Sequence, residues 1–148
     1  MSEDKHETVA AVVVTYNRKD LLRQCLDGIL RQTRPVDAIY VVDNASTDGT
    51  GQMIAAEYAD RVIYERLPEN TGGAGGFHHG MKRPYEDGHD WIWVIDDDVV
   101  HDPDCLKALL EHRASRILVP VHLLDNSTVA EGSAIQLDLQ HPLRRWMK

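Results

Sequence analysis

Residues 9–15, VAAVVVT, form a continuous apolar run in which five of the seven side chains are branched at Cβ. A strand that is apolar on both faces must be covered on both faces, which is typical of inner strands of parallel sheets. Apolar residues then recur on one helical face, at Leu21, Leu22, Cys25, Leu26, Ile29 and Leu30. A buried strand followed by an amphipathic helix predicts the start of a βαβ unit.

The same alternation continues along the chain. Further apolar runs predict strands over residues 38–42, 62–64, 91–95 and 117–121. Helices are predicted after Asp48-Gly49, over the segment that ends near Glu86, and after the cap pair Asp102-Pro103. Strands and helices that alternate in this way join by right-handed crossovers into a mostly parallel sheet flanked by helices. The predicted fold class is therefore α/β.

The composition narrows the classes of partner. The chain has 148 residues, of which 43% are hydrophobic, so a compact domain with a real core is expected. Its net charge of −8 argues against nucleic acid, whose phosphates attract a basic surface. An anionic ligand would therefore need a bound cation. The chain has no long apolar run and no signal-peptide pattern, and Cys25 and Cys105 lack the spacing of a disulfide scaffold. We expect a cytoplasmic protein with reduced thiols.

Polar residues follow three of the predicted strands at the point where each strand ends. They are Thr15, Tyr16, Asn17 and Arg18 at the first strand, Asp43 and Asn44 at the second, and Asp96, Asp97 and Asp98 at the fourth. The carboxyl ends of parallel strands meet at one edge of a sheet, and open α/β sheets bind their ligands there. The sequence therefore predicts a ligand site at this edge.

The three consecutive aspartates repel one another and are costly to hold beside an apolar strand. A divalent cation removes that cost, and Mg²⁺ and Mn²⁺ prefer carboxylate and phosphate oxygens. In an extended segment, alternation points Asp96 and Asp98 the same way and Asp97 the other way. Asp96 and Asp98 are therefore the predicted metal ligands. The alternative is a solvated acidic turn that caps the next helix.

The other strand-end residues each have a ligand role and a structural alternative. Asp43 can accept a hydrogen bond from a base or ribose, or it can form an Asx-turn. Arg18 can pair with a diphosphate, or it can face solvent at the start of a helix, where Asn17 is the expected N-cap. The segment 70–76 carries four glycines, which can approach an anion through backbone N–H groups or form a flexible turn. It matches neither the dinucleotide nor the Walker pattern.

Taken in order, these segments resemble glycosyltransferase family 2, whose members have the GT-A fold. The resemblance is carried by VVVTYNR at 12–18, VVDNASTDGT at 41–50 and IDDD at 95–98. The segment NTGGAGGF at 70–77, followed by Gly80-Met81, is similar to the branch that contains galactofuranosyltransferases and rhamnosyltransferases. The resemblance extends over about residues 8–120 and implies a Rossmann-like sheet of the GT-A type.

The resemblance also implies roles for individual residues. It implies that Thr15, Tyr16 and Arg18 line the nucleotide pocket, that Asp43 contacts the base, and that Asp96, Asp97 and Asp98 bind the ribose and the metal on the diphosphate. From these roles, together with the strand-end and glycine-rich segments, we predict a nucleotide-sugar site formed by Thr15, Tyr16, Arg18, Asp43, Asn44, Asn70, Gly73, Asp96 and Asp97, with Mn²⁺ or Mg²⁺ at Asp96 and Asp98. The implied reaction is inverting transfer from a nucleotide-diphosphate sugar, with UDP-galactofuranose as the predicted donor, to a carbohydrate or lipid-linked glycan acceptor of the cell wall. Such an enzyme would be cytoplasmic or peripheral at the inner face of the cell membrane, and a homo-oligomer is a further expectation.

One part of the family pattern is not found. Family members carry a catalytic base well after the acidic motif, but neither Asp125 nor Glu131 has the expected context, so no base is assigned. The chain is therefore expected to resemble the amino-terminal part of such an enzyme. We predict a donor-binding domain over residues 1–122, truncated after the fifth strand, and the beginning of an acceptor-side region over 123–148. The chain alone is expected to bind a donor without transferring its sugar.

Two other classes of function compete with this interpretation. The first is a non-catalytic module that binds a nucleotide and a metal. The second is a phosphoryl-transfer or receiver-like domain, which also uses strand-end aspartates and a cation. That domain needs a strand-end lysine, which the run at 117–121 does not supply. Stabilisation by UDP with Mn²⁺, but not by acetyl phosphate with Mg²⁺, would separate a glycosyltransferase from the second class.

Overall fold

The computed structural model describes residues 6–111, which contain a four-stranded parallel sheet. Its strands are β1 (Val9–Thr15), β2 (Ala38–Asp43), β3 (Ile63–Arg66) and β4 (Trp91–Asp96), in the order β3-β2-β1-β4. The helices are α1 (Lys19–Leu30), α2 (Thr50–Glu57), α3 (Gly72–Glu86) and α4 (Cys105–Glu111). The chain divides into two compact units after Leu106, and the sheet with helices α1 to α3 belongs to the first of them.

The apolar run at residues 9–15 becomes the inner strand β1. All seven of its residues are buried, because β2 and β4 pair with its two edges and helices cover its two faces. Branched side chains suit such a position because they pack well on a pleated surface. The prediction of an inner parallel strand is confirmed.

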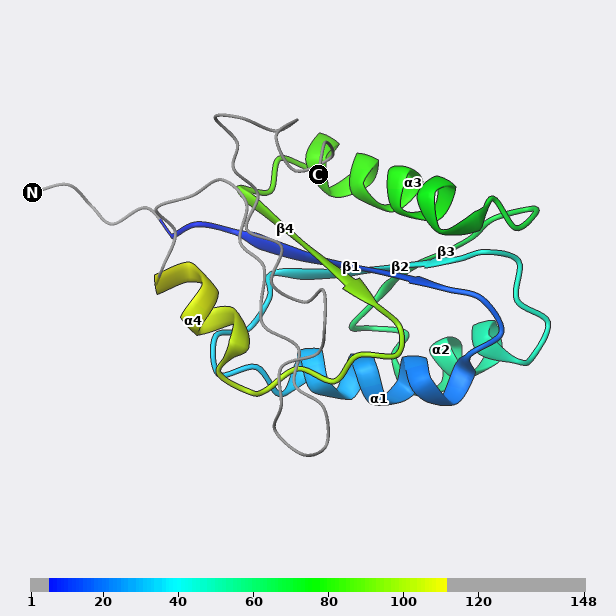
Figure 1. Ribbon diagram of the computed structural model, residues 1–148, viewed down its shortest axis with the longest axis horizontal. Helices are drawn as coiled ribbons and strands as arrows, with labels where there is room; N and C mark the ends of the chain where they lie inside the picture. Colours follow the sequence, from blue (N-terminus) through cyan, green and yellow to red (C-terminus); the bar gives the residue numbers. More distant parts are fainter. Residues whose placement is uncertain (1–5, 112–148) are drawn as a thin grey trace, which may run out of the picture. The chain divides into compact units, whose positions relative to one another are not determined.

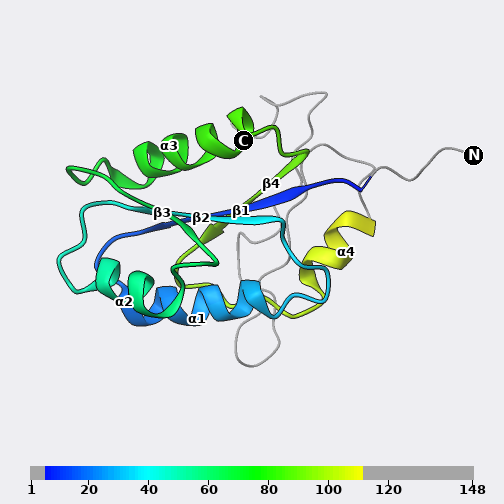
Figure 2. The ribbon, with the colours of Figure 1, turned by 180° about the vertical axis from the view of Figure 1, so that it is seen from behind.

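Helices lie on both faces of the sheet, with α1 and α2 on one face and α3 on the other (Figure 1 and Figure 2). Helix α1 buries the centre of the apolar face that its residue spacing predicts, with Leu22, Cys25, Leu26 and Ile29. Leu21 and Leu30, which the spacing also places on this face, are exposed. The buried residues of α3 are Gly76, Gly80 and Pro84, so its backbone comes close to the sheet. The arrangement of a parallel sheet between helical layers is the predicted α/β fold class.

Element boundaries differ from the predicted ones by more than one residue at three places. Strand β3 extends to Arg66, and α3 already begins at Gly72, so most of the predicted glycine loop is the first turn of a helix. Helix α4 begins only at Cys105, because Asp102 forms a turn in which its carboxylate accepts the backbone N–H of Asp104 at 2.9 Å. The predicted fifth strand over 117–121 and the predicted domain boundary at 122 lie outside the described residues.

Two further expectations can be compared with the structure. Cys25 is buried, Cys105 is partly buried, and both are free thiols. Within residues 6–111, no helix is both long enough and apolar enough to cross a membrane.

Candidate functional site

The carboxyl ends of the inner strands lie together at one edge of the sheet. In the pairing register, Thr15 at the end of β1 lies beside Asp43 at the end of β2. Asp96 at the end of β4 lies beside Val14 of β1. The three polar segments therefore converge at this edge, as predicted.

A buried hydrogen bond ties the end of β1 to the acidic segment. The Thr15 hydroxyl donates to Asp97 Oδ2 at 2.7 Å, and both residues are almost inaccessible to solvent. The other oxygen, Asp97 Oδ1, accepts a hydrogen bond from Arg18 Nη1 at 3.2 Å. The same Nη1 donates to Asp98 Oδ2 at 3.0 Å. Because both oxygens of Asp97 are engaged inside the protein, this carboxylate holds the end of β4 against β1 and the start of α1.

The side chains of the three aspartates do not take their directions from strand alternation, which was the predicted cause. Strand β4 ends at Asp96, and Asp97 and Asp98 lie in a turn, so the alternation of an extended segment does not apply to them. The turn lets Asp97 and Asp98 reach the same guanidinium. Asp97 is nevertheless buried, while Asp96 and Asp98 are exposed, which is the division that the sequence predicted.

Asp43, at the end of β2, is fully buried. Its Oδ1 accepts the backbone N–H of Ser46 at 2.8 Å, and its Oδ2 accepts the Tyr64 hydroxyl at 2.5 Å. Burial raises the pKa of Tyr64, and the hydrogen bond to Asp43 raises it further. This is the structural role that the sequence left as the alternative, and a nucleotide could reach Asp43 only if these neighbours moved. Tyr64 was not predicted, because nothing in the short strand around it marks a site residue.

Two asparagines hold the start of α3. Asn44 is buried, and its Oδ1 accepts hydrogen bonds from the backbone N–H and the hydroxyl of Thr71 at 3.3 and 3.1 Å. Its Nδ2 donates to the carbonyl of Gly72 at 3.2 Å. Asn70 is exposed, and its Oδ1 accepts the backbone N–H of Gly72 at 2.8 Å. Both side chains therefore satisfy backbone groups where a helix begins.

The glycines at the start of α3 have two different surroundings. A Cβ at Gly76 would lie 2.5 Å from Val14 Cγ1 and 2.8 Å from Asn44 Nδ2, so this glycine allows the helix to pack on the sheet. Gly73 is exposed, and nothing lies within 4 Å of its Cβ position. The sequence suggested that the glycine backbone comes close to an anion. At Gly76 the backbone instead comes close to the sheet. A ligand role for Gly73 stays a prediction.

Hydrogen bonds join the loop after β1 to the loop after β2. The Asn17 N–H donates to Ser46 Oγ at 2.9 Å, and the Thr47 N–H donates to Asn17 Oδ1 at 2.7 Å. Asn17 has a φ of 53°, a left-handed conformation in which asparagine is enriched. Its expected N-cap role is wrong: the N-cap of α1 is Arg18, which makes no side-chain capping bond.

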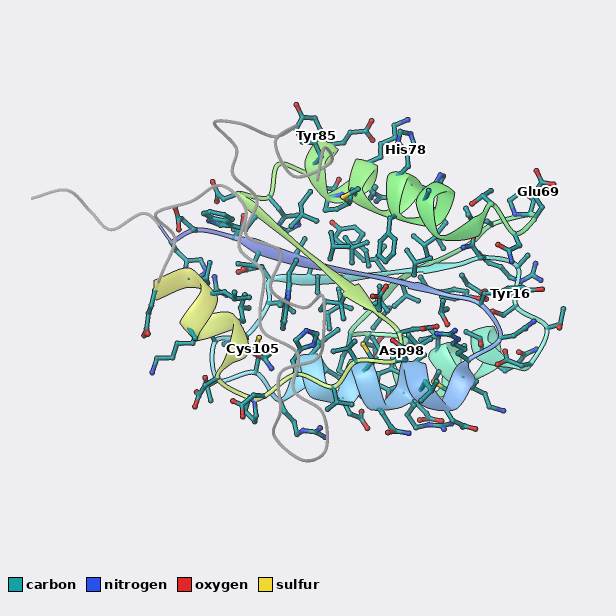
Figure 3. The ribbon with its side chains drawn as sticks, viewed as in Figure 1. Tyr16, Glu69, His78, Tyr85, Asp98 and Cys105 are labelled. Carbon is teal, nitrogen blue, oxygen red and sulfur yellow. The ribbon has the colours of Figure 1, made fainter. Side chains whose placement is uncertain are left out.

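A second group of predicted residues faces the solvent at the same edge. Tyr16 is 47% exposed, and the side chains of Arg18 and Asp98 are 51% and 48% exposed. Asp96 is exposed as well. Figure 3 shows Tyr16 and Asp98 beyond the ends of β1 and β4. The site therefore has a buried polar layer that fixes the loops, and an exposed layer with an aromatic ring, a guanidinium and carboxylates.

The thiol of Cys25 lies next to the acidic segment, and the charges of that segment affect its pKa. Cys25 Sγ lies 3.6 Å from the backbone oxygen of Asp96. Burial, together with the charges of Asp97, Asp98 and Asp96, raises the pKa of Cys25 to about 12. The thiol is therefore protonated at neutral pH, and the carboxylates make this part of the edge unfavourable for an uncompensated anion.

The acidic segment alone offers few ligands for a metal ion. Within residues 6–111, no group of three or more His, Cys, Asp and Glu side chains is arranged to hold one. Mg²⁺ in nucleotide sites needs fewer protein ligands, because one or two carboxylates and the phosphates of the substrate usually bind it. Asp96 and Asp98 are exposed carboxylates of that kind. The residues present therefore fit a hard divalent cation that is shared with a phosphate.

A parallel sheet between helical layers, with polar groups at its carboxyl edge, defines an α/β domain of the GT-A, Rossmann-like type. Comparison with known proteins agrees with this class. Residues 10–117 match Glycosyl transferase family 2, and the chain belongs to this family. The predicted fold and family are confirmed, and the receiver-like alternative is excluded.

The similarity to two longer relatives covers only part of each of them. Galactofuranosyltransferase GlfT1 of Mycobacterium tuberculosis is 43% identical over 96 residues, which cover 62% of this chain and 31% of that protein. Undecaprenyl-phosphate mannosyltransferase of Micrococcus luteus is 35% identical over 109 residues, which cover 70% of this chain and 43% of that protein. The match thus spans less than half the length of either relative.

Solved structures show the same fold. Mannosyltransferase PcManGT from Pyrobaculum calidifontis, in complex with GDP-Man and Mn²⁺, is 27% identical with a TM-score of 0.61, and the match covers 78% of this chain and 35% of that one. S. aureus TarS 1-349, in complex with UDP-GlcNAc, is 22% identical with a TM-score of 0.66, over 84% of this chain and 37% of that one.

Proposed function

We propose that this chain binds a nucleotide-diphosphate sugar through a divalent cation and forms the donor side of an inverting glycosyltransferase, with UDP-galactofuranose as the donor. The observation that carries the proposal is the exposed layer at the carboxyl edge of the sheet, formed by Tyr16, Arg18, Asp96 and Asp98. These side chains come from the ends of two neighbouring strands, β1 and β4. Such an edge is where open α/β sheets bind nucleotides.

The exposed side chains suit the parts of a nucleoside diphosphate. Tyr16 offers a half-exposed ring on which a base can stack. Arg18 carries a planar guanidinium that suits phosphate oxygens, and Asp97 and Asp98 fix it through Nη1. We place Asn70 and Gly73 at the border of the donor site, because both are exposed at the start of α3.

The buried residues act on the ligand through the loops that they hold. Thr15 and Asp97 fix the end of β4. Asn44 fixes the start of α3, and Asp43 fixes the turn that contains Ser46. A site held in this way is organised before the ligand arrives, which reduces the entropy lost on binding.

Asp96 and Asp98 would hold the cation, Mn²⁺ or Mg²⁺, together with the phosphates of the donor. When bound, the cation supplies charge neutralisation for the departing nucleoside diphosphate. The Mn²⁺ named for the mannosyltransferase of Pyrobaculum calidifontis supports this assignment.

The donor sugar is inferred from similarity. GlfT1 proteins named as galactofuranosyltransferases are 40% and 43% identical to this chain, and the segment 70–77 resembles that branch. On the same ground we assign a carbohydrate or lipid-linked glycan as acceptor, a role in the cell wall, and a position in the cytoplasm or at the inner face of the membrane. None of the findings supports a homo-oligomer, and it is not part of the proposal.

Calorimetric titration with UDP tests the donor site. We expect UDP to bind at least about tenfold more tightly with Mn²⁺ than in EDTA, a difference of about 1.4 kcal/mol. GDP with Mn²⁺ is the matched control and should bind more weakly than UDP. Equal affinity in EDTA would remove the metal from the proposal, and equal affinity for GDP would remove the uridine donor.

A second measurement separates an enzyme from a non-catalytic nucleotide-binding module. The chain is incubated with UDP-galactofuranose and Mn²⁺, and the release of UDP is followed over time. Slow release that disappears in Asp98→Ala supports an enzyme, because water can replace the acceptor hydroxyl. Tight donor binding without any release favours the module.

A further inference from the structure

Asp48 lies in the loop between β2 and α2, yet it binds the starts of two helices. Its Oδ2 accepts the backbone N–H of Lys19, the first residue of α1, at 2.9 Å. Its Oδ1 accepts the backbone N–H of Thr50, the first residue of α2, at 3.1 Å and the Thr50 hydroxyl at 2.6 Å. One carboxylate therefore satisfies amides at two helix N-termini, where a negative charge is also favoured by the helix dipoles.

Helix α1 needs a capping group from outside because of the residue at its own N-cap. That residue is Arg18, and a guanidinium has no hydrogen-bond acceptor. Its side chain is instead directed to Asp97 and Asp98. Asp48 supplies the missing acceptor, so the N-cap position is free to carry a cation toward the ligand edge.

The backbone on both sides of Arg18 is held by the same loop. On one side, the Asn17 N–H donates to Ser46 Oγ at 2.9 Å. On the other side, the Lys19 N–H donates to Asp48. The Lys19 ammonium also donates to the Asp48 carbonyl at 3.3 Å. The direction in which the Arg18 side chain leaves the backbone is therefore set by the loop after β2.

The charge of Asp48 persists at neutral pH. Burial alone would raise its pKa, but hydrogen bonds from Thr50 and Lys19 outweigh burial and hold the pKa below its ordinary value. A full negative charge makes the bonds to both helix starts stronger than neutral hydrogen bonds would be.

We infer that Asp48 is a positioning residue of the donor site, which touches no ligand and holds the Arg18 backbone so that the guanidinium lies between the acidic segment and the donor diphosphate. The inference rests on the role proposed for Arg18 above. It goes beyond that role because it assigns the orientation of Arg18, the N-cap residue of α1, to a carboxylate in the loop after β2.

Calorimetry on two single variants, and on the same two changes in an Arg18→Gln background, tests this inference. Asp48→Asn keeps the size of the side chain but turns an NH₂ group toward one of the two helix starts. Asp20→Asn is the matched control: Asp20 lies in the first turn of α1, its side chain is 78% exposed, and it contacts Arg23 rather than another loop. Both changes are made in the wild-type chain and in Arg18→Gln.

UDP affinity with Mn²⁺ should fall about tenfold in Asp48→Asn and stay unchanged in Asp20→Asn. In the Arg18→Gln background, Asp48→Asn should cause no further loss, because the group that it positions is gone. A tenfold loss in both backgrounds would overturn the inference, since Asp48 would then act independently of Arg18. An unchanged UDP affinity of Asp48→Asn in the wild-type chain would overturn the inference as well.

A measurement without ligand keeps this inference distinct from the proposed function. The ¹⁵N–¹H signal of the Arg18 Nε is compared between the wild-type chain and the variants. We expect it to move toward the position of a freely exposed arginine in Asp48→Asn but not in Asp20→Asn. If the wild-type chain bound no UDP, the proposed function would fail, and this signal would still decide the role of Asp48: an unmoved signal overturns it.

Thr50→Val provides a milder change in case Asp48→Asn does not fold. It removes the hydroxyl that donates to Asp48 at 2.6 Å and leaves the carboxylate in place. The Arg18 signal should move in the same direction by a smaller amount. If Asp48→Asn did not fold and the Arg18 signal did not move in Thr50→Val, the inference would be overturned. Asp48 would then have a purely structural role.

Discussion

Thr15 and Asp97 are 82 positions apart in the sequence, and the Thr15 hydroxyl donates to the Asp97 carboxylate at 2.7 Å in a buried contact. The bond joins the end of β1 to the turn after β4. The sequence suggests both residues as contacts of the nucleotide sugar, but here they are partners of each other. The neighbouring Tyr16 and Asp98 are the ones that face solvent. At this edge, the solvent-facing residues therefore stand one position beyond the residues that hold the loops together.

Thr15→Val tests the strength of this contact. Valine keeps the branched shape but has no hydroxyl, so Asp97 loses a buried donor and the free energy of unfolding should fall by about 1–3 kcal/mol. Urea denaturation followed by circular dichroism measures the loss. Thr47→Val is the control, because Thr47 is exposed and its hydroxyl lies 3.5 Å from Asn17 Oδ1. A loss in Thr15→Val no larger than in this control would contradict the prediction.

The fold was predictable because its signals are local and repeated. A strand covered on both faces must be apolar along its length, and residues 9–14 meet that requirement at every position. Helix α1 shows one apolar face and buries most of it. Boundaries were less certain where a helix begins with glycines, because the glycines at Gly72 and beyond indicate a loop as readily as a closely packed helix.

The partners within the site were not predictable. A strand-end asparagine or aspartate has the same sequence signature whether it binds a ligand or a neighbouring loop. Asp48 follows Ser46 and Thr47, and so the local pattern indicates a cap for α2 only; its bond to Lys19 depends on the distance between two loops. Tyr64 likewise becomes a partner of Asp43 only through the pairing of β2 with β3.

Gly76→Ala should destabilise the protein, whereas Gly73→Ala should not. A Cβ at Gly76 would lie 2.5 Å from Val14 Cγ1, so α3 must shift or Val14 must leave its rotamer, at a cost of about 1–3 kcal/mol. Gly73 has nothing within 4 Å of its Cβ position, and alanine there should stabilise the helix by about 0.5–1 kcal/mol. Thermal and urea unfolding of both variants measure the difference. Equal effects would show that α3 does not pack through Gly76.

Tyr40→Phe should change how stability depends on alkaline pH. Burial and a hydrogen bond to Asp87 raise the pKa of Tyr40 from 10.0 to about 12. Between these values the unfolded chain has lost the phenolic proton and the folded chain has kept it, so this residue's contribution to stability is complete below pH 10 and is lost as pH rises to about 12. The decline in unfolding free energy over this range should therefore be shallower in Tyr40→Phe.

Tyr85→Phe is the control for this pH profile. Tyr85 is 77% exposed, so its removal should leave the wild-type slope unchanged. A wild-type slope in Tyr40→Phe, or the same shallow slope in both variants, would contradict the assignment to Tyr40.

Asp98→Ala should abolish the effect of Mn²⁺ on UDP binding without lowering the melting temperature of the free protein. The side chain of Asp98 is 48% exposed and bonds only to Arg18 among the described residues, so little folding energy depends on it. Asp60→Ala removes the same charge from an exposed turn between α2 and β3 and should retain the metal effect. Calorimetry with Mn²⁺ and with EDTA measures both. A large drop in melting temperature for Asp98→Ala would instead assign Asp98 a structural role.

Asp43→Asn should weaken UDP more than pyrophosphate, by about 1–3 kcal/mol, if the base reaches this carboxylate as the family resemblance implies. Asp43 is fully buried and bonded to Ser46 and Tyr64, so a loss of stability alone could also weaken binding. Tyr64→Phe separates the two effects, because it removes the same 2.5 Å hydrogen bond and leaves the Asp43 carboxylate intact. It should lower the free energy of unfolding while UDP and pyrophosphate keep their relative affinities. Equal losses for the two ligands in Asp43→Asn would mean that Asp43 supports the loop and does not recognise the base.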